Sequence, residues 1–270
     1  GVMLAYTPLH ELLLADDDIW VMTSGNTSDE PIAYANEDAL ARLTEIADYF
    51  LLHNRDIHRR ADDSVVRLIG EQPYLLRRSR GYTPLPIRLA KPTVPVLACG
   101  GELKNTFCLT HEQQAFVSAH IGDLENLSTY QYYTDSIQFY KTLFNITPEV
   151  IAYDLHPEYL ATKYAKELPL PQIGVQHHHA HIVSVMAEHG LNEPVIGVAF
   201  DGTGYGSDGA IWGGEFLVAD CCDFRRVVHC SYLPLPGGSQ TIKQPWRLAA
   251  WILSKLYGER MKSLPLEFVR

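Results

Sequence analysis

The spacing of hydrophobic positions changes along the chain and separates an irregular first part from a regular second part. Before residue 90, short apolar runs alternate with turns rich in glycine, asparagine and proline. A basic, proline-rich stretch over 77–93 then interrupts any helical or strand periodicity, because proline fixes φ and lacks a backbone donor. We therefore place a domain boundary near residue 90. The elements expected before it are strands over 18–23, 64–69 and 74–77 and a helix over 35–50, with Asn36 as its N-cap.

Beyond this boundary the pattern becomes regular and favours an α/β fold. Three hydrophobic runs of strand length come first, and helices with apolar positions every three or four residues then alternate with short strands. This order suggests a mixed sheet with an antiparallel edge. The expected strands are 94–99, 106–110, 115–120, 150–154, 173–176 and 195–201, and the expected helices are 127–144, 157–167, 178–189 and 244–257.

Composition limits the classes of protein that the sequence can represent. The 270 residues are enough for one large domain or two modest ones, and a hydrophobic share of 46% argues against wholesale disorder. Acidic residues outnumber basic ones by 32 to 22, which gives a formal net charge of −10. This balance argues against general binding to nucleic acid or to an anionic membrane, because both need a positive field. No apolar run of about 18 residues is present, so we expect no transmembrane helix.

The five cysteines form no CxxC pair, and their number is odd. A disulfide framework or a zinc ribbon explains this pattern poorly, whereas reduced thiols in the cytoplasm explain it well. The chain starts without a methionine or a signal-peptide pattern, and it stops soon after a helical pattern. We therefore expect a cytoplasmic segment of a longer protein.

Four of the 12 histidines lie within residues 177–181, directly after an expected strand. If a helix begins here, His177 and His181 are one turn apart on the same face, whereas His178 and His179 point elsewhere. Two imidazoles on one turn can bind one metal ion, and they suit Zn²⁺, Fe²⁺ or Ni²⁺, so the metal stays open. Core packing is the alternative for any single histidine. The density of the cluster favours a metal or phosphate role.

A glycine-rich segment begins with Asp201 at the end of the next expected strand. Its glycines alternate over 202–209, a pattern typical of a backbone that approaches a ligand closely. No helix follows this segment at once, so a dinucleotide site of the Rossmann type is disfavoured. Asp201 can complete a metal site with His177 and His181. A purely structural glycine-rich β-hairpin is the alternative.

Three other segments have the composition of phosphate-binding loops, and each also has a plain structural interpretation. Residues 23–31 combine glycine, asparagine and hydroxyls, and they can either turn N–H groups toward an anion or form an ordinary turn. Asp62 and Asp63 can hold Mg²⁺ on a nucleotide beside the arginines that follow, although, taken alone, this segment is better explained by a solvated turn and a basic linker. Residues 99–106 can wrap phosphate around Lys104 or form a β-turn. Together, these segments point to nucleotide chemistry split between two domains.

Across nearly its whole length, the sequence resembles the HypF family, the carbamoyltransferases of NiFe-hydrogenase maturation. The matching segments are 22–26, 62–67 (DDSVVR), 77–82 (RRSRGY), 103–107, 120–125, 154–157, 176–181 (QHHHAH), 200–206 (FDGTGYG), 212–215 and 245–247. The resemblance implies two α/β domains. Residues 1–90 look like the C-terminal part of a YrdC-like domain. Residues 94–270 look like the N-terminal part of a TsaD-like domain of the actin/sugar-kinase/Hsp70 (ribonuclease H-like) class.

The resemblance also implies a reaction and its participants. In the family, the YrdC-like domain makes carbamoyl-adenylate from ATP and a carbamate derived from carbamoyl phosphate. The TsaD-like domain then passes the carbamoyl group to the C-terminal cysteine of HypE, for synthesis of a cyanide ligand. The implied cofactors are ATP, Mg²⁺ and one divalent metal, Fe or Zn, and neither nucleic acid nor membrane is an implied partner.

The residues that this resemblance assigns fall into two groups. His177, His181 and Asp201 are the implied catalytic residues and metal ligands. The implied contacts to nucleotide or carbamoyl-adenylate are Ser24, Gly25, Asn26, Arg67, Arg78, Lys104, Asn105, Gly202 and Gly204.

Other functions stay open at this point. The chain can be a non-enzymatic module that binds a metal or a nucleotide, because no resident nucleophile stands out. It can also be an O-carbamoyltransferase that acts on a small molecule. A sugar kinase of the same fold ranks last, because it has no use for the HxxxH helix.

Overall fold

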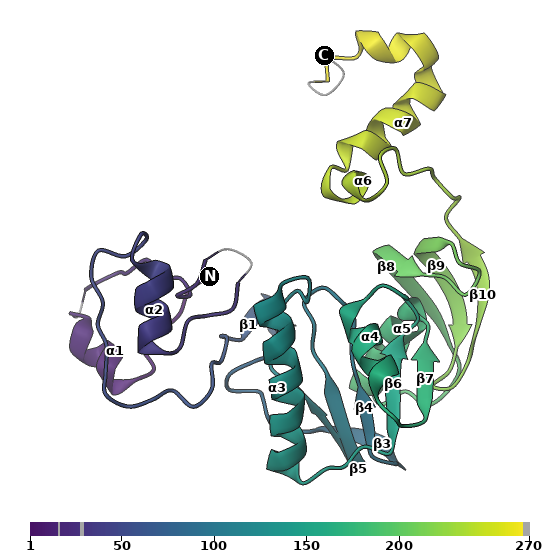
Figure 1. The fold of residues 1–270 in the computed structure, drawn as a ribbon. Helices are drawn as coiled ribbons and strands as arrows, with labels where there is room; N and C mark the ends of the chain where they lie inside the picture. Colours follow the sequence, from purple (N-terminus) through teal and green to yellow (C-terminus); the bar gives the residue numbers. More distant parts are fainter. Residues whose placement is uncertain (16, 28–29, 267–270) are drawn as a thin grey trace. The chain divides into compact units, whose positions relative to one another are not determined.

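The protein is described by a computed structural model that covers residues 1–15, 17–27 and 30–266. Figure 1 shows the helices and strands in chain order, and the chain forms two compact units. The first contains Gly1–Leu85 together with two later segments, Leu103–Thr106 and Ser118–Gln138, and the second contains the rest. The chain therefore crosses between the two units more than once, and no single position separates them.

The first unit consists mainly of short elements joined by long loops. Helix α1 spans Pro8–Leu13 and α2 spans Asn36–Leu43. The two strands expected over 64–69 and 74–77 are β1 (Val65–Ile69) and β2 (Gln72–Arg77), and they pair as an antiparallel hairpin. The helix α3 (Leu127–Phe144) contributes its first two-thirds to this unit.

Two expectations for the first unit are wrong. Residues 18–23 form no strand, because a strand needs a neighbour for its ladder and no described segment pairs with them. Helix α2 begins at Asn36 with Ala35 as its N-cap, and it ends at Leu43, well before residue 50. The side chain of Asn36 instead donates to the carbonyl of His53 at 2.9 Å. At the other end, the Thr44 hydroxyl bonds back to the carbonyl of Leu40, which competes with continuation of the helix.

The second unit contains the expected mixed sheet, with strand order β3-β5-β4-β6-β7. Strands β4, β6 and β7 are parallel, and β5 pairs antiparallel with both β4 and β3. Helix α4 (Leu160–Glu167) packs on β6. The strands are β3 (Ile87–Thr93), β4 (Val96–Ala98), β5 (Cys108–Val117), β6 (Val150–Asp154) and β7 (Gln172–Val175).

The antiparallel edge differs from the expectation in two ways. The two strands expected over 106–110 and 115–120 are one long strand, β5, which continues through Glu112 although that residue has φ 52°. The proline-rich stretch, interpreted as a linker, includes the edge strand β3. Proline is tolerated there because Pro92 has no N–H to donate and an edge strand leaves one side unpaired.

A second, three-stranded antiparallel sheet covers helix α5 (His177–Glu188). It consists of β8 (Val195–Tyr205), β9 (Ile211–Ala219) and β10 (Phe224–His229), and α5 packs on β8 and β9. At Gly197 a Cβ atom would lie 2.2 Å from Cδ1 of Ile182, so only glycine permits this approach of helix and strand. The core between them consists of Ile182, Met186, Ala199, Trp212, Leu217 and Ala219.

The chain ends with three short helical elements beyond the sheet. They are α6 (Ser239–Lys243), α7 (Trp246–Tyr257), which confirms the last expected helix, and the 3₁₀ helix Gly258–Ser263. Among the described residues, no helix has both the length and the apolar composition to cross a membrane.

Replacement of Leu217 by alanine tests this core. Leu217 is fully buried between α5 and the three-stranded sheet, so Leu217→Ala should lower the free energy of unfolding by about 2–5 kcal/mol through lost burial and a cavity. Urea unfolding followed by circular dichroism measures this change. Ile196→Ala on β8, where the side chain is 78% exposed, is the control and should change the stability little. Equal effects of the two substitutions would contradict the packing.

Candidate functional site

The histidine cluster forms the first turn of α5, directly after β7. Gln176 is the N-cap, and its side-chain oxygen accepts from the N–H of His179 at 2.9 Å. The helix then presents His177 and His181 on one face, with their Nε2 atoms 3.2 Å apart. Two tetrahedral zinc ligands with metal–nitrogen bonds of about 2.0–2.1 Å would have a similar separation, about 3.3 Å. The spacing therefore suits one shared ion.

Asp201 on β8 brings a carboxylate to the same point. Its Oδ2 lies 2.9 Å from Nε2 of His177 and 3.7 Å from Nε2 of His181, and the three ligand atoms lie within 4.8 Å of one another. This Oδ2 is buried, and among the described residues it faces the two imidazoles, while the other oxygen accepts from the N–H of Gly202 at 2.6 Å. A buried carboxylate oxygen that faces two imidazole nitrogens is a donor set that suits a divalent cation.

Asp154, at the carboxyl end of β6, holds His177 from behind. Its Oδ2 lies 2.6 Å from Nδ1 of His177, so Nδ1 donates to Asp154, and Nε2 is the nitrogen that faces Asp201 and would bind an ion. Metal-binding histidines commonly have such a carboxylate partner, which fixes the tautomer and raises the basicity of the ligand. Asp154 thus orients the nitrogen that would bind the ion.

The charges of this cluster are strongly coupled. The Asp154 hydrogen bond, followed by Asp201, raises the pKa of His177 to about 9, and the close His177 imidazole holds the pKa of Asp201 well below its usual range. Burial and the same carboxylates raise the pKa of nearby Tyr159 to about 12, so this phenol stays protonated at neutral pH. Without an ion, a proton on His177 offsets the carboxylates, and a bound cation would take over this role.

The other two histidines have structural roles. His178 is fully buried, and its Nδ1 lies 3.1 Å from the side-chain amide of Gln176. His179 is also buried and contacts the carbonyl of Asp220 through Nε2 at 2.8 Å. At Gly204, a Cβ atom would lie 2.4 Å from Cε1 of His178. Gly204, expected at the nucleotide, therefore lets β8 pass close to α5, while Gly202 borders Asp201.

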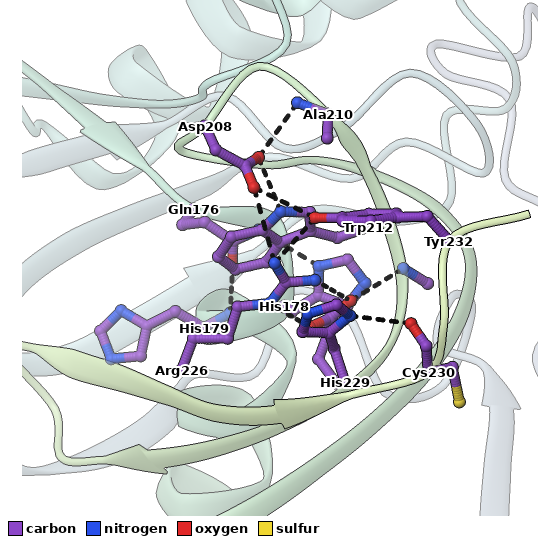
Figure 2. A network of polar contacts seen from close by, with 12 residues as sticks. Gln176, His178, His179, Asp208, Ala210, Trp212, Arg226, His229, Cys230 and Tyr232 are labelled. Carbon is purple, nitrogen blue, oxygen red and sulfur yellow. Dashed lines mark hydrogen bonds and ion pairs between the residues drawn. The ribbon is translucent and has the colours of Figure 1, made fainter.

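A polar network supports the glycine-rich hairpin that follows Asp201 (Figure 2). The Arg226 guanidinium binds the buried Glu215 through Nε at 2.6 Å and through a terminal nitrogen at 2.9 Å, and it lies 3.9 Å from the centre of the Trp212 ring. Asp208 in the hairpin accepts from the indole of Trp212 at 2.8 Å and from the Tyr232 hydroxyl at 3.1 Å. These contacts tie the hairpin to β9 and β10.

A separate polar cavity of about 320 Å³ lies in the first unit. Ser24, Asn26 and Lys104, three of the expected nucleotide contacts, line it. Asn105 is buried beside it and pairs through its backbone with Gly122, with a nitrogen–oxygen distance of 2.9 Å. Gly25 is not part of the lining.

The arginines that line this cavity differ from the two that the resemblance assigned to the nucleotide. Arg60 and Arg77 line it, whereas Arg67 lies on the exposed strand β1 and Arg78 donates to the carbonyls of Tyr82 and Leu85. The expected carboxylate pair also separates. Asp62 lines the cavity, but Asp63 forms an ion pair with Arg80, so the two do not converge as Mg²⁺ ligands would.

Sequence reasoning gave no role to Asp154, Arg60 and His120. Asp154 had a usable signal, because it ends a strand predicted with the correct bounds and the carboxyl ends of parallel strands gather functional side chains. Arg60 and His120 had no such signal, because they are 60 residues apart in the sequence and meet only in the fold.

Three family models match successive regions of the chain. A family model described as "Telomere recombination", of the Sua5, YciO and YrdC type, matches residues 1–79. "HypF Kae1-like domain" matches 91–188, and "Carbamoyltransferase, Kae1-like Domain, second subdomain" matches 197–268. The three candidate metal ligands, His177, His181 and Asp201, fall within the latter two models.

Relatives match nearly the whole chain. Carbamoyltransferase HypF of Synechocystis sp. is 49% identical over 96% of the chain, and Carbamoyltransferase HypF2 of Cupriavidus necator is 47% identical over 93%. In each case the chain covers 34% of the relative, so it spans about a third of the length of the curated relatives it matches.

Solved structures agree with these sequence relatives. A full-length HypF in a phosphate- and nucleotide-bound form has a TM-score of 0.89 at 49% identity, over 97% of this chain and 44% of that one. HypF of T. kodakarensis has a TM-score of 0.81 at 41% identity, over 90% of this chain and 32% of that one.

The fold and the matched models define a protein of mixed α/β structure that combines YrdC-like and Kae1-like domains. Both Kae1-like models, the relatives and the solved structures agree on one family within this class. The chain belongs to the HypF family, whose named members are carbamoyltransferases.

Replacement of Asp154 by asparagine tests its role behind His177. Asp154→Asn keeps the size of the side chain but removes the carboxylate that fixes the His177 tautomer, so the affinity for Zn²⁺ should fall about 10–100-fold. Competition with a chromogenic chelator measures the affinity. Glu158→Gln, an exposed carboxylate near the same strand end, is the control and should bind Zn²⁺ like the unchanged chain. Unaltered affinity of Asp154→Asn would show that the contact does not tune the site.

Proposed function

We propose that the chain carries the transfer site of an ATP-dependent carbamoyltransferase of NiFe-hydrogenase maturation, in the cytoplasm. The observation that carries this proposal is the convergence of His177, His181 and Asp201, with Asp154 behind His177, in a chain of the HypF family. A sugar kinase of related fold would have no use for such a cluster. The acidic net charge of −10 supports a substrate other than nucleic acid.

The proposed reaction has two steps. The oxygen of a carbamate derived from carbamoyl phosphate attacks the α-phosphorus of ATP, and pyrophosphate leaves. The C-terminal cysteine thiolate of HypE then attacks the carbamoyl carbon, and AMP leaves. Carbamate itself is a poor electrophile, so adenylation provides the leaving group that the second step needs. Carbamoyl-adenylate hydrolyses readily, so enclosure of the intermediate would protect it.

The residues of the cluster fit one divalent metal ion, Fe or Zn. His177 and His181 would hold it through Nε2, and Asp201 through its carboxylate. When bound, such an ion offsets negative charge that develops on a phosphate leaving group. Asp154 keeps His177 oriented, and the exposed position of His181 leaves one side of the cluster accessible.

Space for a small acyl group lies beside the imidazoles. A cavity of about 310 Å³ is bordered by Gly100 and Gly101 after β4, by Asp154 after β6, and by His177 and His181. Gly100 has φ 74°, which permits a tight backbone turn at this wall. These residues support a position for the carbamoyl group next to the metal ligands.

ATP with Mg²⁺ is proposed for the polar cavity of the first unit. Ser24, Asn26 and Lys104 line it and supply hydroxyl, amide and ammonium donors, and Gly25 and Asn105 shape the adjoining backbone. Arg67, Arg78, Gly202 and Gly204 lie outside this lining, so we propose no direct phosphate contact for them. The phosphate- and nucleotide-bound HypF structure supports ATP as the class of ligand.

The reaction is tested with a HypF protein of full family length that carries this sequence. Incubation with carbamoyl phosphate, Mg²⁺ATP and HypE should add a carbamoyl group to the C-terminal cysteine of HypE, detected by mass spectrometry. Omission of ATP should abolish the product. A protein that binds Zn²⁺ and ATP but releases no pyrophosphate would instead be a non-enzymatic module, and transfer to a small-molecule hydroxyl alone would favour an O-carbamoyltransferase.

Removal of both proposed imidazole ligands tests the metal site. His177→Ala with His181→Ala should eliminate stoichiometric metal, measured by mass spectrometry of the purified protein, and should lower the rate of HypE carbamoylation about 100-fold or more. His189→Ala, an exposed histidine that follows the same helix, is the control and should retain both properties. Full metal content in the double variant would contradict the assignment of these ligands.

A further inference from the structure

Arg60 is a half-buried cation, and one of its guanidinium nitrogens lacks an acceptor among the described residues. Its guanidinium carbon lies 3.4 Å from the centre of the Tyr132 ring, and Arg60 lines the polar cavity of the first unit. One terminal nitrogen is buried and has no hydrogen-bond partner among the described residues. Burial lowers the pKa of Arg60, yet a guanidinium remains protonated at neutral pH. A buried charged donor without an acceptor is costly unless a ligand supplies one.

The neighbouring Arg59 differs from Arg60, because its guanidinium binds helix α3 and does not line the cavity. Arg59 donates to the carbonyl of Asp135 at 3.2 Å and to the Ser136 hydroxyl at 3.4 Å, both on α3. Tyr132 on the same helix donates its hydroxyl to the carbonyl of Arg60 at 3.3 Å. Arg59 is thus used to hold α3, while Tyr132 holds the Arg60 guanidinium flat against its ring.

The carboxylates around the cavity have other partners. Glu30 pairs with Arg42 at 2.8 Å. Asp62 attracts Arg60 electrostatically, but its ion pair at 3.9 Å is with Arg77. Among the residues that the structure describes, the acidic side chains therefore leave Arg60 without a close counter-ion.

Two further donors line the same cavity from later in the chain. Asp123 accepts from the backbone N–H of Lys104 at 2.7 Å, and it holds Lys104 in the left-handed region at φ 49°. A non-glycine residue held in this region commonly marks a functional position. His120 is half-buried in the cavity wall and makes no hydrogen bond with the described residues. Its imidazole is therefore available to a ligand.

We propose that Arg60, Lys104 and His120 form one subsite for a phosphate group, with Tyr132 as the positioning residue for Arg60. Guanidinium, ammonium and imidazole are the donors that phosphate oxygens prefer, and three of them converge on one cavity. The phosphate belongs either to a nucleotide or to an acyl phosphate such as carbamoyl phosphate, and this choice of ligand rests on the proposed function.

The subsite joins residues of two matched domains. Arg60 belongs to the region of the YrdC-type model, residues 1–79, whereas Lys104, His120 and Tyr132 belong to the Kae1-like region, residues 91–188. All four lie in the first compact unit. The YrdC-type region therefore contributes only part of this phosphate site, and residues of the Kae1-like region complete it.

Calorimetric titration of the 270-residue chain tests the subsite without any measurement of catalysis. The probes are ATP, carbamoyl phosphate and inorganic phosphate. Arg60→Gln should weaken the binding of at least one phosphate ester or anhydride on the order of 10–100-fold, because a charge-assisted contact is lost. The matched control, Arg59→Gln, removes the adjacent arginine that faces α3, and it should bind within about twofold of the unchanged chain.

The pattern across probes identifies the source of the phosphate. A loss confined to ATP assigns the subsite to the nucleotide, and a loss confined to carbamoyl phosphate assigns it to the acyl phosphate. Unchanged affinity of Arg60→Gln for all three probes overturns the proposal. Because HypE transfer is not measured, failure of the proposed transfer reaction would leave this outcome intact, and the reverse also holds.

Further variants keep the test decisive if Arg60→Gln does not fold. Lys104→Gln alters an exposed side chain, so folding should persist while the same probe binds at least about fivefold more weakly. Tyr132→Phe keeps the ring under Arg60 and should retain most of the affinity, whereas Tyr132→Leu should lose it. Wild-type affinity in both Lys104→Gln and Tyr132→Leu overturns the two-domain subsite.

Discussion

The contact of 2.6 Å between Asp154 and His177 is the interaction on which the candidate metal site depends. It joins the carboxyl end of β6 in the five-stranded sheet to the first turn of α5. The same imidazole then faces Asp201 on β8, in the three-stranded sheet. One imidazole thus connects three elements that are distant in sequence, and its two nitrogens have different tasks: Nδ1 is held, and Nε2 is presented. The glycine at position 204 and the Arg226 network serve this arrangement by letting β8 approach and by fixing the hairpin beyond it.

Prediction from the sequence succeeded where the determining contacts are local. The helix over 127–144 and the strand over 150–154 have the predicted bounds, because their hydrophobic periods are long or end at clear turns. The pairing of His177 and His181 follows from helical geometry alone. Prediction failed where a distant partner decides. Residues 18–23 have strand-like composition but no ladder, and β3 exists because β5 offers an edge to a proline-containing segment.

The two candidate sites favour ions of opposite charge, although both lie in an acidic chain. At the histidine cluster, two carboxylates surround one imidazole, and the excess negative charge favours a cation. In the polar cavity Glu30 and Asp62 pair with Arg42 and Arg77, whereas one buried nitrogen of Arg60 lacks an acceptor among the described residues, which favours an anion. The net charge of −10 therefore says little about either site, because local pairing rather than the total sets the preference of each.

The connectivity of the two compact units has an evolutionary consequence. The chain passes from one unit to the other after Leu85, Glu102, Thr106, Val117 and Gln138, and the last of these crossings lies within α3. Domains joined by a single linker can be exchanged between genes as modules, because each retains all of its own contacts. Here the first unit includes Leu103–Thr106 and Ser118–Gln138, which lie within the region matched by the HypF Kae1-like model, residues 91–188. Recombination at the boundary between the models would deprive it of them, so the pair is expected to be inherited as one block.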